Sequence, residues 1–298
     1  VAGAAENWPF LLVGSMGFGV CLSLCVTRWS AILDRQNLSI PYRRAFALYF
    51  VGQFFNAFLF GATGGDVVKA YYVAADTHHK KAEVVSTVFI DRLIGLLALI
   101  ALMIVMTLVR FRFFMAAPQT RVALVFNSAF LVMAVIALIL VARQNVFERW
   151  PLFVRFEKNT ALGGILSRMV KALRICLNHP RLLRKTVLLS SLNHLWFILC
   201  AFYLGMALDI DLDFIDYVTV FPIINAVAAL PLTPGGIGTR EGAAIYLLGA
   251  MNVPAHKAVT LSLFLYATVL LWSLIGGVVY LFFSYRRGRL PPSAMTVE

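Results

Sequence analysis

The sequence predicts an all-α polytopic integral membrane protein with an internal inverted repeat and two re-entrant, broken helical hairpins. Of its 298 residues, 61% are hydrophobic and only 13% are charged, whereas a soluble domain is roughly half apolar and a quarter charged. Two apolar stretches, 45–80 and 217–251, are each interrupted by glycine-rich polar sequence. In lipid, an interrupted backbone is tolerated only where protein or a water-filled cavity covers it. A pair of such interruptions in corresponding halves indicates the substrate site of a transporter.

The first membrane half, 1–142, contains three apolar runs long enough to span a bilayer at about 20 residues each. These runs are 8–32, 84–109 and 122–141. The first hairpin, 45–80, lies between the first two of them. Its leading part is apolar, but the sequence after Gly64-Gly65 becomes polar too quickly to cross a membrane alone. A re-entrant hairpin therefore fits this stretch better than two full crossings.

A basic connector, 143–185, follows with ten Lys or Arg residues and two Glu. Within it, apolar residues of 162–173 fall on one helical face, which predicts a basic amphipathic helix on a membrane surface. An ordinary solvated connector between two halves is the alternative.

The second membrane half, 186–285, repeats the pattern of the first. Two runs, 186–207 and 259–283, are long enough to span. Between them an acidic loop, 209–216, leads into the second hairpin, 217–251, which breaks at 233–239. The tail, 286–298, is basic.

The distribution of basic residues predicts an orientation, because cytoplasmic loops carry an excess of Lys and Arg. The segments 28–44, 143–185 and 285–298 are then cytoplasmic, and the two hairpins enter the membrane from opposite sides. One feature disagrees, because Arg110, Arg112 and Arg121 fall in an outside loop. The excess in the connector is far larger, so we keep this orientation.

The first break places Gly64, Gly65 and Asp66 at the start of a half-helix. Glycines allow a ligand or another backbone to approach closely. Asp66 could cap the half-helix, or it could bind a cation, a proton or a lipid amine at membrane depth. Lys69, one turn later, could neutralise Asp66 or contact a phosphate. Asn56 precedes this break and is a further candidate.

The second break contains two prolines and four glycines within twelve residues, so a helix cannot continue through it. We expect Thr239 to be the N-cap of the half-helix that follows. The positive end of that half-helix and the charge of Arg240 predict an anion site, with a lipid phosphate as the natural anion. A structural pair between Arg240 and Glu241 is the alternative. Asn225 precedes this break at a spacing similar to that of Asn56.

Asp91 and Arg92 interrupt an apolar run that continues for about 17 residues after them. They could lie near the end of the span and reach the surface, or they could line a cavity. We favour the cavity. The complete set of predicted substrate-binding residues is Asn56, Gly64, Gly65, Asp66, Lys69, Asp91, Arg92, Asn225, Thr233, Gly235, Gly236, Thr239, Arg240 and Glu241.

Several classes of function are not indicated by the sequence. The net charge of +12 lies in loops between apolar runs, which favours contact with anionic lipid over nucleic acid. The four cysteines and five histidines do not form metal-binding spacings. No nucleotide-binding or catalytic motif is present. We therefore expect no cofactor, no metal and no enzymatic activity.

Three motifs in order resemble the flippase-like family of the lysylphosphatidylglycerol synthase transmembrane region, which includes the flippase half of the multiple peptide resistance factor. They are Gly64-Gly65-Asp66, then Asp91-Arg92-Leu93 with Gly95-Leu96, and Pro231 to Gly238 ending in Glu241. The resemblance covers about residues 8–285. Departures are Asp91 where the family usually has Glu, and Gly61-Ala62-Thr63 where a Pro is common. The resemblance also implies one further helix before Val1.

The resemblance implies transbilayer movement of a phospholipid or lipid-linked headgroup, in a bacterial inner membrane. No aminoacyltransferase domain follows in this sequence, so we do not expect synthesis of aminoacyl lipid. The expected partners are membrane lipids, above all anionic phospholipid, with a second copy of the chain or a lipid-synthesis enzyme as candidate protein partners. One alternative is a non-catalytic scaffold for lipid or envelope synthesis enzymes. The other is a lipid-linked glycosyltransferase, for which the acidic loop 209–216 would have to supply the catalytic carboxylate.

Overall fold

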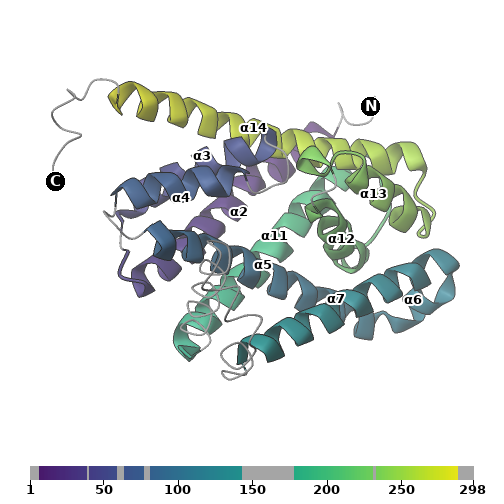
Figure 1. Cartoon of the computed structure of the whole chain (residues 1–298). Coiled ribbons are helices and arrows are strands. Elements are labelled where there is room, and N and C mark those ends of the chain that lie inside the picture. The colour runs from purple at the N-terminus through teal and green to yellow at the C-terminus, as the bar shows by residue number, and fades with distance from the viewer. Residues whose placement is uncertain are drawn as a thin grey trace.

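The structure, a computed structural model, describes residues 7–38, 40–58, 64–76, 81–142, 178–230 and 233–287. Within these ranges every regular element is helical (Figure 1). The predicted surface helix at 162–173 and the end of the basic tail, 288–298, lie outside the described residues.

The first half of the described chain consists of α2 (Trp8–Arg35), α3 (Tyr42–Phe58), α4 (Gly64–Asp76), α5 (Lys81–Val109), α6 (Phe111–Ala116) and α7 (Pro118–Ala142). The second half consists of α11 (Pro180–Met206), α12 (Phe214–Ala229), the 3₁₀ turn η1 (Pro234–Gly236), α13 (Thr239–Gly249) and α14 (Ala255–Arg287).

Five helices of the described ranges are long and apolar enough to cross a membrane: α2, α5, α7, α11 and α14. These are the five predicted spans, so the prediction of an all-helical, multi-span membrane protein is confirmed. The helices of the two predicted hairpins are shorter. α3, at 17 residues, and α12, at 16, each precede an interruption, and the helices that follow them have 13 and 11 residues.

Local sequence sets where the helices begin and end. α12 begins with a capping box, in which the Asp213 side chain accepts from the backbone and the Asp216 carboxylate accepts from the Asp213 N–H at 3.2 Å. α11 begins at Pro180, six residues before the predicted start of this span. Proline is favoured in the first helical turn because that N–H has no partner within the helix. The last residues of the predicted connector, from Arg181 to Lys185, are thus helical and continue into the span.

The helices pack in matching pairs. In each half a long helix is followed by two shorter ones and then by another long helix, in the order α2–α3–α4–α5 and α11–α12–α13–α14. The most extensive contact joins the first members, α2 and α11, and the next joins α14 to α3. In the matching order of the two halves, the contact of α14 with α3 corresponds to a contact of α5 with α12, which is also present. The two shorter helices of each half also pack on each other, α3 on α4 and α12 on α13. In Figure 1, α2 and α11 both run from the lower left to the upper right of the view.

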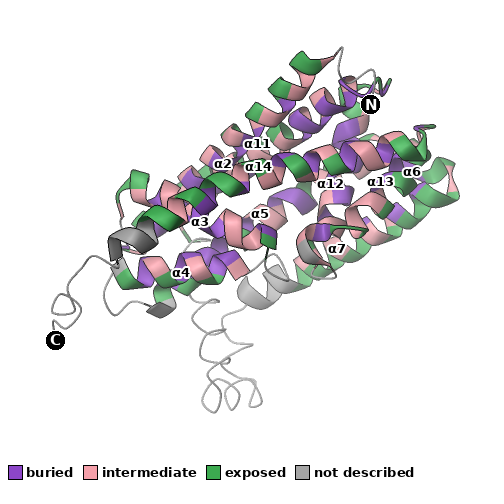
Figure 2. Ribbon diagram, turned by 90° about the horizontal axis from the view of Figure 1, so that it is seen from above, coloured by how far each residue is buried: buried purple, intermediate pink, exposed green. Residues whose placement is uncertain are grey.

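The largest apolar core lies in the second half and reaches α5, with Tyr217, Phe221 and Leu248 among its buried members. A second core joins α2, α3, α4 and the start of α5 around Trp29. α7 lies at the edge of the bundle, where Val125, Val132 and Met133 are exposed (Figure 2). Apolar side chains on this outer face are suited to contact with lipid tails.

Polar contacts define the two ends of the bundle. At one end Arg110 donates to Asp216 at 2.7 Å, and Lys257 donates to the backbone carbonyl of Asp209 at 2.6 Å. At the other end the Arg35 and His179 side chains are in contact. The sequence placed Arg110 in an outside loop, against the positive-inside rule. In the structure its charge is neutralised there by Asp216 of the acidic loop.

Candidate functional site

The first break is closed by a tight approach of α3 and α4. Gly65 lies against α3 so closely that a Cβ atom at this position would overlap the carbonyl oxygen of Gly52. The Gly65 N–H, one of the donors left open at a helix start, donates to the Asn56 side-chain oxygen at 2.9 Å. Gly64 is the first residue of α4 and is half-buried. Asn56 and the two glycines, all three predicted site residues, thus lie together at the first break.

Asp66 is bound by two cations. Arg92 in α5 donates from Nε to one carboxylate oxygen at 2.7 Å, and Lys69 Nζ lies 3.4 Å from the other. Asp66 and Lys69 are buried, whereas the Arg92 side chain is 50% exposed. Because charged groups are costly to bury without a partner, this arrangement accounts for the burial of Asp66. It also means that the carboxylate already has internal partners.

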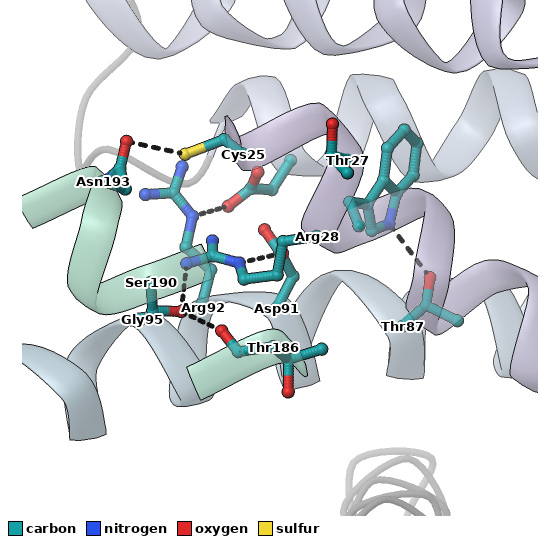
Figure 3. A network of polar contacts seen from close by, with 12 residues as sticks. Cys25, Thr27, Arg28, Thr87, Asp91, Arg92, Gly95, Thr186, Ser190 and Asn193 are labelled. Atoms are coloured by element: carbon teal, nitrogen blue, oxygen red, sulfur yellow. Dashed lines mark hydrogen bonds and ion pairs between the residues drawn. The ribbon is translucent and has the colours of Figure 1, made fainter. Parts of the chain in front are cut away.

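Asp91 pairs with Arg28, which the sequence analysis had assigned to a cytoplasmic loop. The structure corrects that assignment, because α2 continues to Arg35 and Arg28 is 5% exposed. Arg28 Nε donates to Asp91 Oδ1 at 2.7 Å, and Arg28 Nη1 donates to Ser190 Oγ of α11 at 2.8 Å (Figure 3). The second carboxylate oxygen of Asp91 is buried and has no hydrogen-bond partner among the described residues.

These five residues form what we call the buried charge cluster: Arg28, Asp66, Lys69, Asp91 and Arg92. Its members come from α2, α4 and α5, and Ser190 attaches α11 to it. Figure 3 shows Arg28, Asp91 and Arg92 meeting between α2, α5 and α11. The cluster therefore joins the first hairpin to helices of both halves.

The second break is shaped by three glycines with positive φ angles: Gly235 at 62°, Gly236 at 76° and Gly238 at 85°. Side chains other than glycine rarely adopt this region. The Arg240 side chain donates back to the Gly235 carbonyl at 3.2 Å, and its guanidinium lies 5.8 Å from the centre of the Tyr266 ring. Arg240 thereby holds the turn that precedes its own helix.

The start of α13 differs from the prediction. Gly238 is the N-cap, and Thr239 is the first helical residue, where its hydroxyl donates to the Gly236 carbonyl at 3.0 Å and lies 3.5 Å from that of Thr233. Since Gly238 has no side chain, the cap comes from Glu241, whose carboxylate accepts the Gly238 N–H.

The other Glu241 oxygen accepts from the Ser262 hydroxyl of α14 at 2.7 Å. Within the described residues no ion pair joins Arg240 to Glu241, so the alternative of a structural pair between them is not observed. Arg240 Nε is buried and has no hydrogen-bond partner in the described part of the chain.

A small enclosed gap lies beside Arg240. Asn225, Arg240 and Ser262 contribute its polar lining, and the other lining residues are apolar. The gap leaves no room for a water molecule. In this structure α12, α13 and α14 therefore pack closely around Asn225, Arg240 and Ser262.

Sequence reasoning missed four partners of these groups: Arg28, Ser190, Ser262 and Tyr266. Arg28 carried a signal, since the apolar residues Trp29, Ile32 and Leu33 continue the span beyond it. The others are common residues in apolar helices, and only the packing of distant helices brings them to the site.

Comparison with known proteins places this arrangement in a family. A family described as "Lysylphosphatidylglycerol synthase TM region" matches residues 4–277. A UPF0104 membrane protein of Pyrococcus horikoshii is 24% identical over 91% of this chain and 86% of its own length. A second one, of Methanocaldococcus jannaschii, is 27% identical over 71% of this chain and 86% of its own length. No solved structure matches this chain. The protein is an integral membrane protein that belongs to the family of the lysylphosphatidylglycerol synthase transmembrane region.

Proposed function

We propose that this protein moves a phospholipid or a lipid-linked headgroup between the two leaflets of the membrane, as a transporter without catalytic activity. The observation that carries this proposal is the position of the Asp66–Arg92 pair. Arg92 lies eleven residues after the start of α5 and seventeen before its end, which at 1.5 Å per residue is about 16 Å from one end and about 25 Å from the other. Charged residues at such depth are costly and usually mark the path of a substrate or ion.

Two re-entrant hairpins would supply the polar path. α3 and α4 join α2 to α5, whereas α12 and α13 join α11 to α14, and η1 of the second break contacts α3. Asp66 and Glu241 are each the third residue of the second helix in their hairpin, and each is bonded to the long helix that follows. This correspondence and the matching helix contacts support an inverted repeat. Broken helices at a repeat interface are where transporters bind their substrates.

The two ends of the bundle support an orientation. The end that contains Arg35 and His179 holds the last turn of α2 and the start of α11, next to basic sequence, and the end that contains Asp209 and Asp216 is acidic. We place the basic end in the cytoplasm, following the positive-inside rule. The first hairpin would then enter from the cytoplasm and the second from the outside.

Arg240 is the residue that we assign to the lipid phosphate. It combines a charge with the positive end of α13, and its Nε, which has no hydrogen-bond partner among the described residues, gives it a donor to offer once the gap opens. In the described structure Asp66 and Glu241 both have internal partners. Asp66 therefore holds the cations Lys69 and Arg92 in place, and Glu241 caps the start of α13. The acyl chains would remain in the bilayer.

A leaflet-exchange assay tests the proposal. Purified protein is placed in liposomes with headgroup-labelled phosphatidylglycerol, and the fraction accessible to an impermeant quencher is followed over time. A zwitterionic lipid is measured in parallel. We expect exchange by the wild-type protein and its loss in Asp66→Ala and Arg240→Ala. Arg121→Ala, which changes an exposed arginine that donates to the Met115 carbonyl, is the matched control and should exchange normally.

Wild-type exchange rates in both folded site variants would remove Asp66 and Arg240 from the path. Absence of exchange for every lipid, from protein shown to be folded, would instead favour a non-catalytic scaffold. That reading predicts that the hairpin charges are dispensable in cells, whereas the basic connector 143–185 is not.

A further inference from the structure

The contact between α14 and α3 is a close approach of two backbones. A Cβ atom at Gly276 would overlap the carbonyl oxygen of Phe50, and one at Gly277 would lie 2.8 Å from the Phe54 ring. Helices packed at this distance have no long side chains between them that could take up a displacement, and such interiors resist deformation. We therefore expect α3 to stay on α14.

The corresponding contact in the matching order, between α5 and α12, is built differently. α12 contains no glycine, and Gly95, the glycine of α5, lies against Arg28 of α2. α5 instead contributes the side chains of Leu99, Met103 and Met106 to the core that also contains α12. Methionine is unbranched and adapts to the shape of its surroundings. This contact can therefore open and close again at a lower cost than one between two backbones.

Two features of α12 also favour movement of this helix. Pro222 lies inside α12 and cannot donate the backbone hydrogen bond that would join it to Val218. The Tyr217 hydroxyl is buried and has no hydrogen-bond partner among the described residues. A buried hydroxyl without a partner is costly, and contact with water would remove that cost. The observed position of α12 therefore depends on other contacts that hold it.

An ion pair between Arg110 and Asp216 joins the end of α5 to the start of α12. Arg110 directly follows α5, Asp216 is the third residue of α12, and the N–O distance is 2.7 Å. The other Asp216 oxygen accepts the Asp213 N–H, so the same carboxylate caps α12. The two side chains are 32% and 16% exposed. Water can therefore replace this pair far more readily than it can replace the buried pair of Arg28 and Asp91.

We propose that Arg110 and Asp216 form a latch at the acidic end of the bundle, and that its opening lets α12 and the second break move away from α5 while α3 stays on α14. This inference rests on the proposed function, because it makes the opening the route by which a headgroup reaches Arg240. It adds which hairpin moves and which contact controls the movement. The opening itself needs no lipid substrate, so it can be measured separately from transport.

A cysteine behind the latch tests the proposal. Met106 lies one helical turn before Arg110 and is 4% exposed. In a background without the native cysteines, Met106→Cys should therefore react slowly with an impermeant thiol reagent. The protein is held in lipid nanodiscs, in which both ends of the bundle face the reagent. Leu48→Cys, at a fully buried position in α3, reports on the part of the bundle that should not open.

Three variants of the latch end are compared in both cysteine backgrounds. Arg110→Gln removes the ion pair, whereas Arg110→Lys keeps its charge. Arg112→Gln is the matched control, because it removes an exposed arginine from the same end of the bundle and leaves the latch intact.

We expect Arg110→Gln to raise the labelling rate of Met106→Cys about fivefold, the scale of one partly exposed ion pair. Arg110→Lys and Arg112→Gln should stay within about twofold of the intact latch. High salt should raise the rate when the latch is intact, because it screens exposed charges, and should have no effect in Arg110→Gln. Equal labelling with and without the latch, or a similar rise at Leu48→Cys, would overturn the inference.

Two further arms keep the result interpretable. If Met106→Cys does not give a folded protein, hydrogen exchange is measured with the native cysteines in place. The α12 amides should then exchange faster in Arg110→Gln than in wild type while the α3 amides do not, and equal rates in α12 would contradict the latch. Leaflet exchange is assayed on the same samples. Opening without lipid exchange in any of them, wild type included, would contradict the proposed function and keep the latch, whereas lipid exchange with labelling that Arg110→Gln leaves unchanged would do the reverse.

Discussion

Arg28 and Asp91 form an ion pair with an N–O distance of 2.7 Å, with side chains only 6% and 1% exposed. The two residues are 63 positions apart and lie on different spanning helices. A buried pair of this kind adds little net stability as a unit, but the loss of one partner leaves the other charge buried alone.

We therefore expect Arg28→Met to lower the free energy of unfolding by about 3–5 kcal/mol. The double variant Arg28→Met, Asp91→Met should recover a large part of this loss, because it leaves no unpaired charge. Thermal unfolding in detergent, followed by intrinsic fluorescence, measures both. A single variant as stable as wild type would show that the pair does not hold α2 to α5.

The close approach at the first break makes a second prediction. Gly65→Ala places a methyl group where the Gly52 carbonyl lies, so α3 and α4 must separate. We expect a loss of about 1–3 kcal/mol, typical of an overpacked core, together with slower leaflet exchange.

Gly242→Ala is the matched control, since it lies in α13 with open space around the added methyl group. Alanine is the better helix former by up to about 1 kcal/mol, so this variant should be at least as stable as wild type. If Gly65→Ala proved equally harmless, the two helices would not be in contact at these glycines.

The contacts at the two ends of the bundle predict which sites are accessible from the same side of the membrane. In a background without the four native cysteines, single cysteines at Arg112 and Asp211 should react with an impermeant maleimide from one side. Those at Arg43 and Arg184 should react only from the other side or after permeabilisation. Labelling of the cysteines introduced at positions 112 and 184 from the same side in intact cells would contradict the arrangement of α5, α7 and α11.

The cap supplied by Glu241 makes the fourth prediction. Glu241→Ala removes the acceptor of both the Gly238 N–H and the Ser262 hydroxyl, so the first turn of α13 should fray at a cost of about 1 kcal/mol. Hydrogen exchange of the α13 amides should then be faster. Asp211→Ala, in the acidic loop, should leave that exchange unchanged, and the idea fails if the two variants behave alike.

The spans and the breaks could be predicted from the sequence because each depends on residues that are close together in the chain. Hydropathy identifies α5 and α14, and the close succession of Pro234 with the glycines at 235, 236 and 238 ends a helix. The partners of Asp66, Asp91 and Glu241 could not be predicted in the same way. Their contacts join residues that are 21 to 63 positions apart and lie on different helices, and the relative rotation of those helices follows from packing along their whole length.

The contact between Arg28 and Ser190 has a consequence for how such a protein could move. It lies in the seam between α2 and α11, which is the most extensive helix contact in the described chain. Separating the two halves along this seam would strip a buried arginine of one of its partners. This seam therefore favours a transport cycle in which α2 and α11 stay together and the hairpin tips form the moving barrier.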